Sequence, residues 1–298
     1  MSIRFGVSPI AWANDDMPEL GGDTPLETIL AEAAAIGFEG IELGGKFPRD
    51  AAALAPLLAR HKLALVGGWY SGSLLVQSAE AEIEALQPHL ALLKAMSSTV
   101  FVFAETSNAV HGDRAQPLTA TPRLANWDAF GERLTAVARY IKGEGLRFAY
   151  HHHLGTVVER ADDLAHFIER TGDEVGLTLD TGHAALGGVD PVRVISEHPT
   201  RIAHVHCKDV RGPVHAAARK AGKSFLDGVV EGMFTVPGDG GIDFSVVMKA
   251  LKSIDYSGWI VVEAEQDPTI ANPREYQTLG LATLKREAAA AGLIEEGR

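Results

Sequence analysis

Eight short β-rich runs alternate with helical patterns along the chain, and this alternation limits the possible folds more than any other feature. The runs are IRFGVS, GIEL, LALVGG, TVFVFA, RFAYH, VGLTLD, IAHVHC and WIVVEA. Between them lie amphipathic or alanine-rich segments such as TPLETILAEAAAIG. In that segment we expect Thr24 to cap a helix, Pro25 to occupy its first turn and Glu27 to complete a capping box.

Apolar strands joined by helices indicate a parallel sheet that is covered on both faces. Eight such units in about 250 residues match a closed (β/α)8 barrel, the TIM barrel of the α/β class. No linker interrupts the pattern, so we expect one domain over residues 1–298. The main alternative is an open doubly wound sheet, but the glycine-rich phosphate fingerprint that usually follows its first strand is missing from the sequence.

One segment, at about residues 209–243, is too long for an ordinary connection between a strand and a helix. It carries the basic residues Arg211, Arg219, Lys220 and Lys223. Long connections on the catalytic face of a barrel often form lids. A subunit contact and a solvated surface helix are the alternatives.

The charge balance and the cysteine content narrow the class of partner. A formal net charge of −12 disfavours nucleic acid, because binding to phosphates needs clustered Lys and Arg. A small neutral or metal-chelated substrate fits better. Cys207 is the only cysteine, which excludes an intramolecular disulfide, and no apolar stretch approaches the roughly 20 residues that span a bilayer. We therefore expect a cytoplasmic protein without a membrane partner.

Ionisable side chains stand at the ends of most predicted strands. The carboxyl ends of barrel strands form the active site, so polar residues there carry more functional weight than elsewhere. Any one of these residues could be a hydrogen-bonded packing group, but so many are hard to assign to packing alone. They are Glu42, Glu105, His151, His152, His153, Asp180, His204, His206, Glu263 and Glu265.

Strand periodicity predicts which of these side chains point into the barrel. Side chains alternate between faces, so His204, His206 and Lys208 share one face, while Val205 and Cys207 face the helices. The same rule places Glu263 and Glu265 together, with Trp259 and Val261 deeper on that face. In YHHHLG it separates His151 and His153 from Tyr150 and His152, but it does not say which pair faces inward.

Imidazole and carboxylate groups that converge from several strands are typical ligands of a borderline divalent cation. Mn²⁺, Co²⁺ and Zn²⁺ all fit such a mixed set, and the lack of a cysteine pair argues against a structural zinc cluster. The alternative is a buried hydrogen-bonded network without a metal, which would be costly to satisfy inside a barrel.

Several stretches between residues 12 and 268 carry a family resemblance. They are WANDDMPELGGDTPLETILAEAAAIGFEGIELGGKFP, YHHHLGTVVE, LTLDTGHAALGG, IAHVHCKDVR and GWIVVEAEQDP. With these stretches the chain resembles the xylose-isomerase-like barrels of sugar isomerases and epimerases, and among them the inosose dehydratases. The Asp-Thr-Gly-His and His-x-His turns are shared across that superfamily, whereas NDDMPELGGDTPLE and VEAEQDP are much more particular.

The resemblance implies a lyase of inositol catabolism that removes water from 2-keto-myo-inositol to give a trihydroxycyclohexane-dione. Similar enzymes use Co²⁺ or Mn²⁺, and glutathione is an additional requirement of some. The resemblance carries a metal-binding role to Asp180, His206 and Glu263, and a substrate contact to His183. Strand five departs from the superfamily, which commonly has a metal-binding Glu there, and we expect His151 to take its place.

The chemistry of such a dehydration needs three kinds of group. A cation stabilises the enolate of the ketone, a base removes the α-hydrogen, and an acid protonates the departing hydroxyl group. Our candidates for base and acid are Lys208, His183, His153 and Glu265. A Lys208 ammonium beside a bound cation should lose its proton more readily, although a salt bridge to Asp209 or a loop carboxylate is an equal alternative.

We expect further substrate contacts from Glu42, Glu105 and His204, although Glu42 could simply hold a loop. The predicted partner is a small cyclic keto-polyol, and assembly into a homo-oligomer is left open. Isomerisation or epimerisation of a sugar by the same metal is the second function that the sequence allows. A non-catalytic sugar-binding module and a metal-dependent DNA-repair nuclease fit less well, because of the many titratable groups and the absence of a basic stripe.

Overall fold

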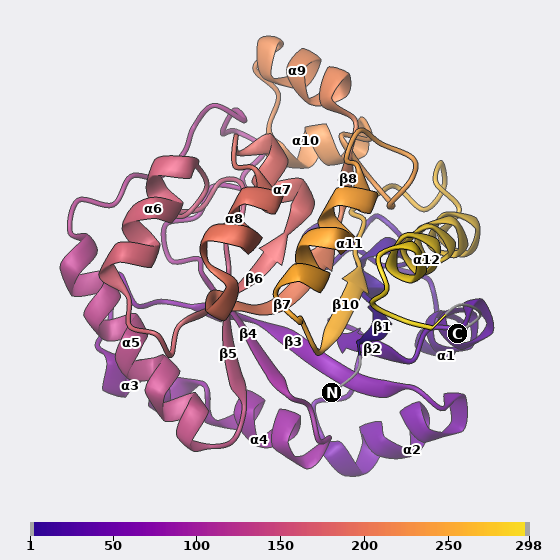
Figure 1. The fold of residues 1–298 in the computed structure, drawn as a ribbon, viewed down its shortest axis with the longest axis horizontal. Helices are drawn as coiled ribbons and strands as arrows, with labels where there is room; N and C mark the ends of the chain where they lie inside the picture. Colours follow the sequence, from indigo (N-terminus) through magenta and orange to yellow (C-terminus); the bar gives the residue numbers. More distant parts are fainter. Residues whose placement is uncertain (1–2, 296–298) are drawn as a thin grey trace.

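In the computed structural model of the protein, which describes residues 3–295, eight parallel strands close into a barrel (Figure 1). β1 pairs with β2 on one side and with β10 on the other, so the sheet has no open edge. The predicted (β/α)8 barrel is confirmed and the open doubly wound sheet is excluded. In barrel order the strands are β1 (Arg4–Val7), β2 (Gly40–Leu43), β3 (Ala64–Gly72), β4 (Val100–Glu105), β5 (Arg147–His151), β6 (Gly176–Asp180), β7 (Ile202–Cys207) and β10 (Trp259–Val262).

Helices surround the barrel, as Figure 1 shows. No helix within residues 3–295 is long and apolar enough to cross a membrane. Residues 1–2 and 296–298 of the predicted single domain lie outside the described residues. The surrounding helices are α1 (Leu26–Ile36), α2 (Ala51–His61), α3 (Ala79–Ala85), α4 (Gln87–Ala95), α5 (Trp127–Gly143), α6 (Ala161–Arg170), α7 (Thr181–Leu186), α8 (Pro191–Glu197), α11 (Phe244–Ser253) and α12 (Pro273–Ala290).

The predicted capping box of the first helix is wrong. α1 begins at Leu26, and Pro25 takes the N-cap position in an extended conformation with no side-chain cap. Thr24 therefore lies one residue too early to accept from the first free N–H groups of the helix. The helix ends at Gly37, which lies in the left-handed region with a φ of 101°, a conformation that favours glycine.

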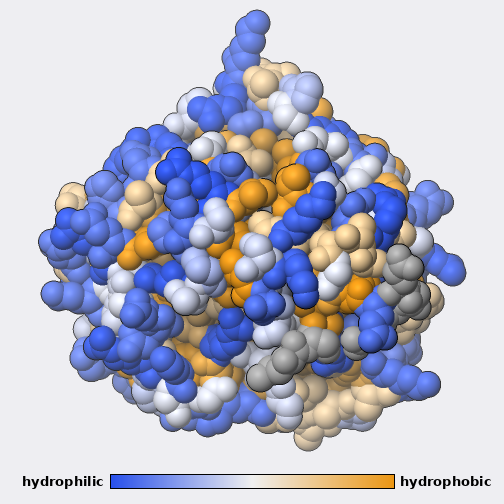
Figure 2. All heavy atoms as spheres, viewed as in Figure 1, coloured by the Kyte–Doolittle hydropathy of each residue, from blue (hydrophilic) through white to orange (hydrophobic). Residues whose placement is uncertain are grey.

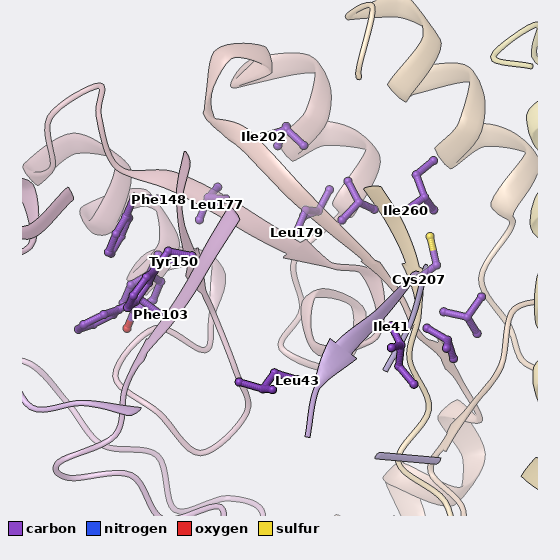
Figure 3. Close-up of a cluster of buried hydrophobic side chains, with 14 of the residues drawn as sticks. Ile41, Leu43, Phe103, Phe148, Tyr150, Leu177, Leu179, Ile202, Cys207 and Ile260 are labelled. Atoms are coloured by element: carbon purple, nitrogen blue, oxygen red, sulfur yellow. The ribbon is translucent and has the colours of Figure 1, made fainter. Parts of the chain in front are cut away.

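The main apolar core lies between the barrel and its helices. Alternate strand residues point outward into it, and each large aliphatic or aromatic side chain removed from water contributes about 1.5–3 kcal/mol. Figure 3 shows part of this layer, with Ile41, Leu43, Phe103, Phe148, Tyr150, Leu177, Leu179, Ile202, Cys207 and Ile260 labelled. On the outside, hydrophilic side chains cover most of the face drawn in Figure 2.

The interior of the barrel divides into an apolar and a polar part. Small groups of buried apolar side chains fill one part, including Val66 with Trp259 and Val261, and Val100 with Val102. Buried histidines and carboxylates occupy the carboxyl ends of the strands. This division leaves the polar end as the place where the barrel can do chemistry.

The connection after β7 is not an irregular loop. It contains β8 (Asp209–Val210), α9 (Gly212–Lys220), α10 (Phe225–Val230) and β9 (Phe234–Thr235), and β8 pairs with β9 in an antiparallel ribbon. In Figure 1, α9 and α10 stand beside the barrel mouth next to α7. A second apolar cluster that includes Phe225, Phe234 and Met17 packs this connection onto the mouth.

Candidate metal centre

The strand-seven pattern is as the sequence predicts. Val205 and Cys207 belong to the core outside the barrel, whereas His204, His206 and Lys208 are buried and join the polar groups at the barrel mouth. The alternation of side chains along one strand therefore aims three ionisable groups into the barrel.

The structure also decides the strand-five question that periodicity leaves open. Tyr150 points outward and packs on Phe167, with ring centroids 4.6 Å apart. His151 points inward and lies against His206, with ring centroids 5.0 Å apart. His153, which follows the end of β5, lines the cavity at the mouth.

The four residues predicted to bind a metal lie together. His151, Asp180, His206 and Glu263 each offer one donor atom, and these atoms all lie within 4.8 Å of one another. His206 Nδ1 is 2.7 Å from Glu263 Oε2, 3.2 Å from His151 Nε2 and 3.8 Å from Asp180 Oδ2. Two imidazole nitrogens and two carboxylate oxygens form a mixed set that suits a borderline divalent cation.

The Asp180 carboxylate supplies the observation that a cation fits here. Its Oδ1 accepts the backbone N–H groups of Gly182 and His183, both at 2.8 Å, and so caps α7. Among residues 3–295, its Oδ2 has no hydrogen-bond partner, although the residue is 0% exposed. Burial raises the pKa of Asp180 to about 6. A buried carboxylate oxygen without a partner is costly, and a bound cation would compensate for it.

Glu42 contacts His206 on the side away from the proposed ligands, and the same oxygen of Glu42 contacts His204. Glu42 Oε1 lies 3.0 Å from His206 Nε2 and 2.9 Å from His204 Nε2. Burial opposes the charge of Glu42, but the attraction of His206 and the hydrogen bonds outweigh it and lower the pKa of Glu42 to about 2. A proton on His206 Nε2 leaves Nδ1 free to bind a metal. His204 does not line the cavity, contrary to the predicted substrate contact.

A second polar group lies beside the first. Lys208 Nζ is 2.5 Å from Glu265 Oε1, 2.8 Å from Glu263 Oε1 and 2.9 Å from His183 Nε2. Burial works against the ammonium charge, yet Glu263, Glu265 and Asp180 outweigh it and raise the pKa of Lys208. These carboxylates favour the ammonium form of Lys208, and the predicted loss of its proton beside a bound cation stays a prediction. Its partners are these glutamates and not Asp209.

The backbone of Leu154 contacts two adjacent imidazoles, those of His153 and His183. The rings of His153 and His183 lie 3.8 Å apart between centroids. His153 Nδ1 is 2.7 Å from the Leu154 carbonyl oxygen, and the Leu154 N–H donates to His183 Nδ1 at 3.3 Å. With its Nδ1–H donated to that carbonyl, His153 presents an unprotonated Nε2.

A cavity of about 400 Å³ opens onto both polar groups. Sequence reasoning missed several residues of its wall, although Asp15 and Asp16 fall in the segment that carries the most particular resemblance. Trp69 lies against His151, with ring centroids 5.2 Å apart. Ser8 directly follows β1, so its position after a strand was a signal that could have found it. The missed lining residues include Ser8, Asp15, Asp16, Arg49, Trp69, Ser71 and His111.

Glu105 faces away from this cavity, contrary to the predicted substrate contact. It shares the outward parity of Phe101 and Phe103 on β4, and its Oε1 accepts from the backbone and the hydroxyl group of Ser107. Burial raises its pKa. The end of a strand alone was a poor signal here, because the last residue of a strand points inward or outward by parity.

Comparisons with known proteins agree with this geometry. Residues 30–287 match the family described as "Xylose isomerase-like TIM barrel". The chain is 48% identical to "Rhizopine catabolism protein MocC" of Rhizobium meliloti, over 98% of this chain and 90% of that protein. It is 40% identical to "Inosose dehydratase" of Geobacillus thermodenitrificans, over 92% of this chain and 93% of that protein.

A solved structure of an L-ribulose 3-epimerase shares the fold. Its TM-score is 0.67 at 19% identity, and the match covers 100% of this chain and 99% of the other. At that identity the likeness concerns the fold alone. The family match and the two long alignments extend over most of the chain, so the protein belongs to the xylose isomerase-like TIM barrel family.

Proposed function

We propose that the protein is a metal-dependent lyase of inositol catabolism. It removes one water from 2-keto-myo-inositol (scyllo-inosose) and gives a trihydroxycyclohexane-1,2-dione. The observation that carries the proposal is the group of His151, Asp180, His206 and Glu263 beside a cavity, in a chain 40% identical to an inosose dehydratase over 92% of its length.

These four residues would hold the cation, which we propose to be Mn²⁺ or Co²⁺, with Zn²⁺ as a third candidate. When bound, a divalent cation supplies the positive charge that stabilises the negative charge developing on a ketone oxygen as the neighbouring C–H loses its proton. Glu42 supports this arrangement by accepting from His206 Nε2.

The proposed proton-transfer groups are His153, His183, Lys208 and Glu265, which lie next to the metal ligands. His153 and Glu265 line the cavity, so both are placed to reach a bound substrate. His153 presents an unprotonated Nε2 that can accept the α-hydrogen as a proton. Glu265 Oε1 and His183 Nε2 both lie within hydrogen-bonding distance of Lys208 Nζ. Lys208 and these two partners can therefore supply the proton with which the hydroxyl group departs as water.

Phe225 and Phe234 shield this side of the site. Phe234 lies 5.0 Å from the His183 ring and Phe225 lies 5.1 Å from the His153 ring, between centroids. Excluding bulk water matters for an elimination, because the enolate must lose its β-hydroxyl group before it is reprotonated at carbon.

Sugar epimerisation is the second candidate, and the likeness in fold to an L-ribulose 3-epimerase favours keeping it. Both reactions begin with loss of an α-hydrogen. They differ in the second step, because an epimerase returns a proton to the opposite face and a dehydratase expels a hydroxyl group.

Incubation of the metal-loaded protein with 2-keto-myo-inositol in D₂O separates the two candidates. Mass spectrometry of a dehydration shows a product lighter by one water, together with the absorbance of an enone or dione. Epimerisation keeps all the oxygen atoms and introduces deuterium at carbon. The chelated protein is the control, and absence of both products from the loaded protein would refute the proposal.

Other sequence predictions remain predictions. They are one domain over residues 1–298, a glutathione requirement, a cytoplasmic location and assembly into a homo-oligomer. Size-exclusion chromatography with light scattering measures the assembly, and turnover with and without glutathione measures the requirement.

A further inference from the structure

Asp209 is a buried carboxylate that the proposed reaction does not use. The residue is 0% exposed and follows Lys208, but its side chain takes no part in the polar groups around the cavity. Its oxygens accept four backbone N–H groups instead. The donors are Val210 at 2.8 Å, Ile242 at 2.9 Å, Gly240 at 3.0 Å and Gly238 at 3.1 Å.

The turn that supplies three of these donors is built closely around the carboxylate. A Cβ added to Gly240 would lie 2.4 Å from Asp209 Oδ1 and 2.6 Å from the Val210 carbonyl oxygen. Gly238 has a φ of 93°, a conformation that favours glycine. By contrast, a Cβ added to Gly241 would meet only the Val210 carbonyl oxygen, at 3.7 Å.

This turn ends the connection that passes over the site. Asp209 pairs with Thr235 and Val210 pairs with Phe234 in the β8–β9 ribbon. The ring of Phe234 lies 4.6 Å from Lys208 Nζ and 5.0 Å from the His183 ring centroid. The carboxylate therefore joins the start of the connection to its end at the point where an aromatic ring covers the proton-transfer groups.

We propose that Asp209 is a positioning residue, whose carboxylate holds segment 233–242 against β8 so that Phe234 seals Lys208 and His183 from water. The inference rests on the proposed elimination. If the seal is lost, water returns a proton to the carbanionic carbon more often than the β-hydroxyl group departs. The fraction of enolate that reverts to substrate then rises.

The test uses Asp209→Asn and Gly240→Ala. In Asp209→Asn an NH₂ group replaces one acceptor and faces two backbone N–H donors. Gly240→Ala keeps the carboxylate but pushes the turn away from it. Gly241→Ala is the matched control, since its added Cβ makes only an ordinary contact. The measurement, in D₂O with the full metal-loaded protein, is the ratio of deuterium recovered in unreacted substrate to product formed.

We expect both test variants to raise this ratio and to lower kcat by about 10–100-fold, as a displacement of about 1 Å does at other sites, with metal content unchanged. Gly241→Ala should match the wild type. A wild-type ratio in both test variants, with or without a lower melting temperature, would overturn the positioning role. A wild-type protein that forms no dehydration product would instead count against the proposed function.

Discussion

Replacing Asp180 by Asn separates two roles of one carboxylate. Oδ1 accepts the N–H groups of Gly182 and His183, so an Asn keeps its amide oxygen there and preserves the cap of α7. Its NH₂ group then takes the place of Oδ2, which lies 3.8 Å from His206 Nδ1 and 3.9 Å from His151 Nε2. The variant should therefore fold with His183 in place and fail to bind the cation.

The structure also predicts the sign of the stability change. The pKa of Asp180 is raised to about 6 from its ordinary value of 3.8, chiefly by burial. Because the folded value is the higher one, the ionised carboxylate destabilises the metal-free fold above pH 6, and this cost disappears as the pH falls below 3.8. A buried polar atom without a partner costs about 1–3 kcal/mol, so at pH 8 we expect Asp180→Asn to raise the unfolding free energy of the metal-free protein by about that amount.

Added metal should make the wild type more stable to unfolding than Asp180→Asn. At a free cation concentration of about 1,000 times Kd, binding adds about 4.1 kcal/mol to the wild type and nothing to the variant, which exceeds the variant's expected advantage. Urea unfolding of both chelated proteins at pH 8, repeated with Mn²⁺, measures both changes, and elemental analysis after dialysis gives the metal content. A variant that is less stable than the wild type without metal, or that retains a stoichiometric ion, would refute this account of Asp180.

Three further predictions concern the same centre. His183→Ala should lose turnover but retain the ion, because His183 Nε2 faces Lys208; complete loss of metal in elemental analysis would contradict this. Glu42→Gln should weaken metal binding about 10–100-fold in calorimetry, since it changes the partner of His206 Nε2, and an unchanged Kd would show that this contact does not tune the site. Chelation should abolish turnover and Mn²⁺ or Co²⁺ should restore it, whereas full activity of the metal-free protein would exclude the proposed role of the cation.

The sequence predicted the barrel and the inward set on β7 because both depend on local periodicity. Alternation along one strand fixes the relative faces of His204, His206 and Lys208, and the apolar pair between them shows which face meets the helices. The same reasoning failed on strands where apolar and polar residues do not alternate clearly. The segment YHHHLG did not show which of its side chains point into the barrel. Glu105 was chosen only because it ends a strand.

The contacts within the site depend on residues that are distant along the chain. His204 accompanies Glu42, 162 residues away, and the charge of Lys208 depends on Glu265, 57 residues further on. The carboxylate oxygen of Asp180 that lacks a partner is visible only when every nearby donor is placed. Local alternation thus determined which residues of β7 enter the barrel. Distances across the closed barrel decided which side chains meet, because charge, hydrogen bonding and burial act through space and not along the chain.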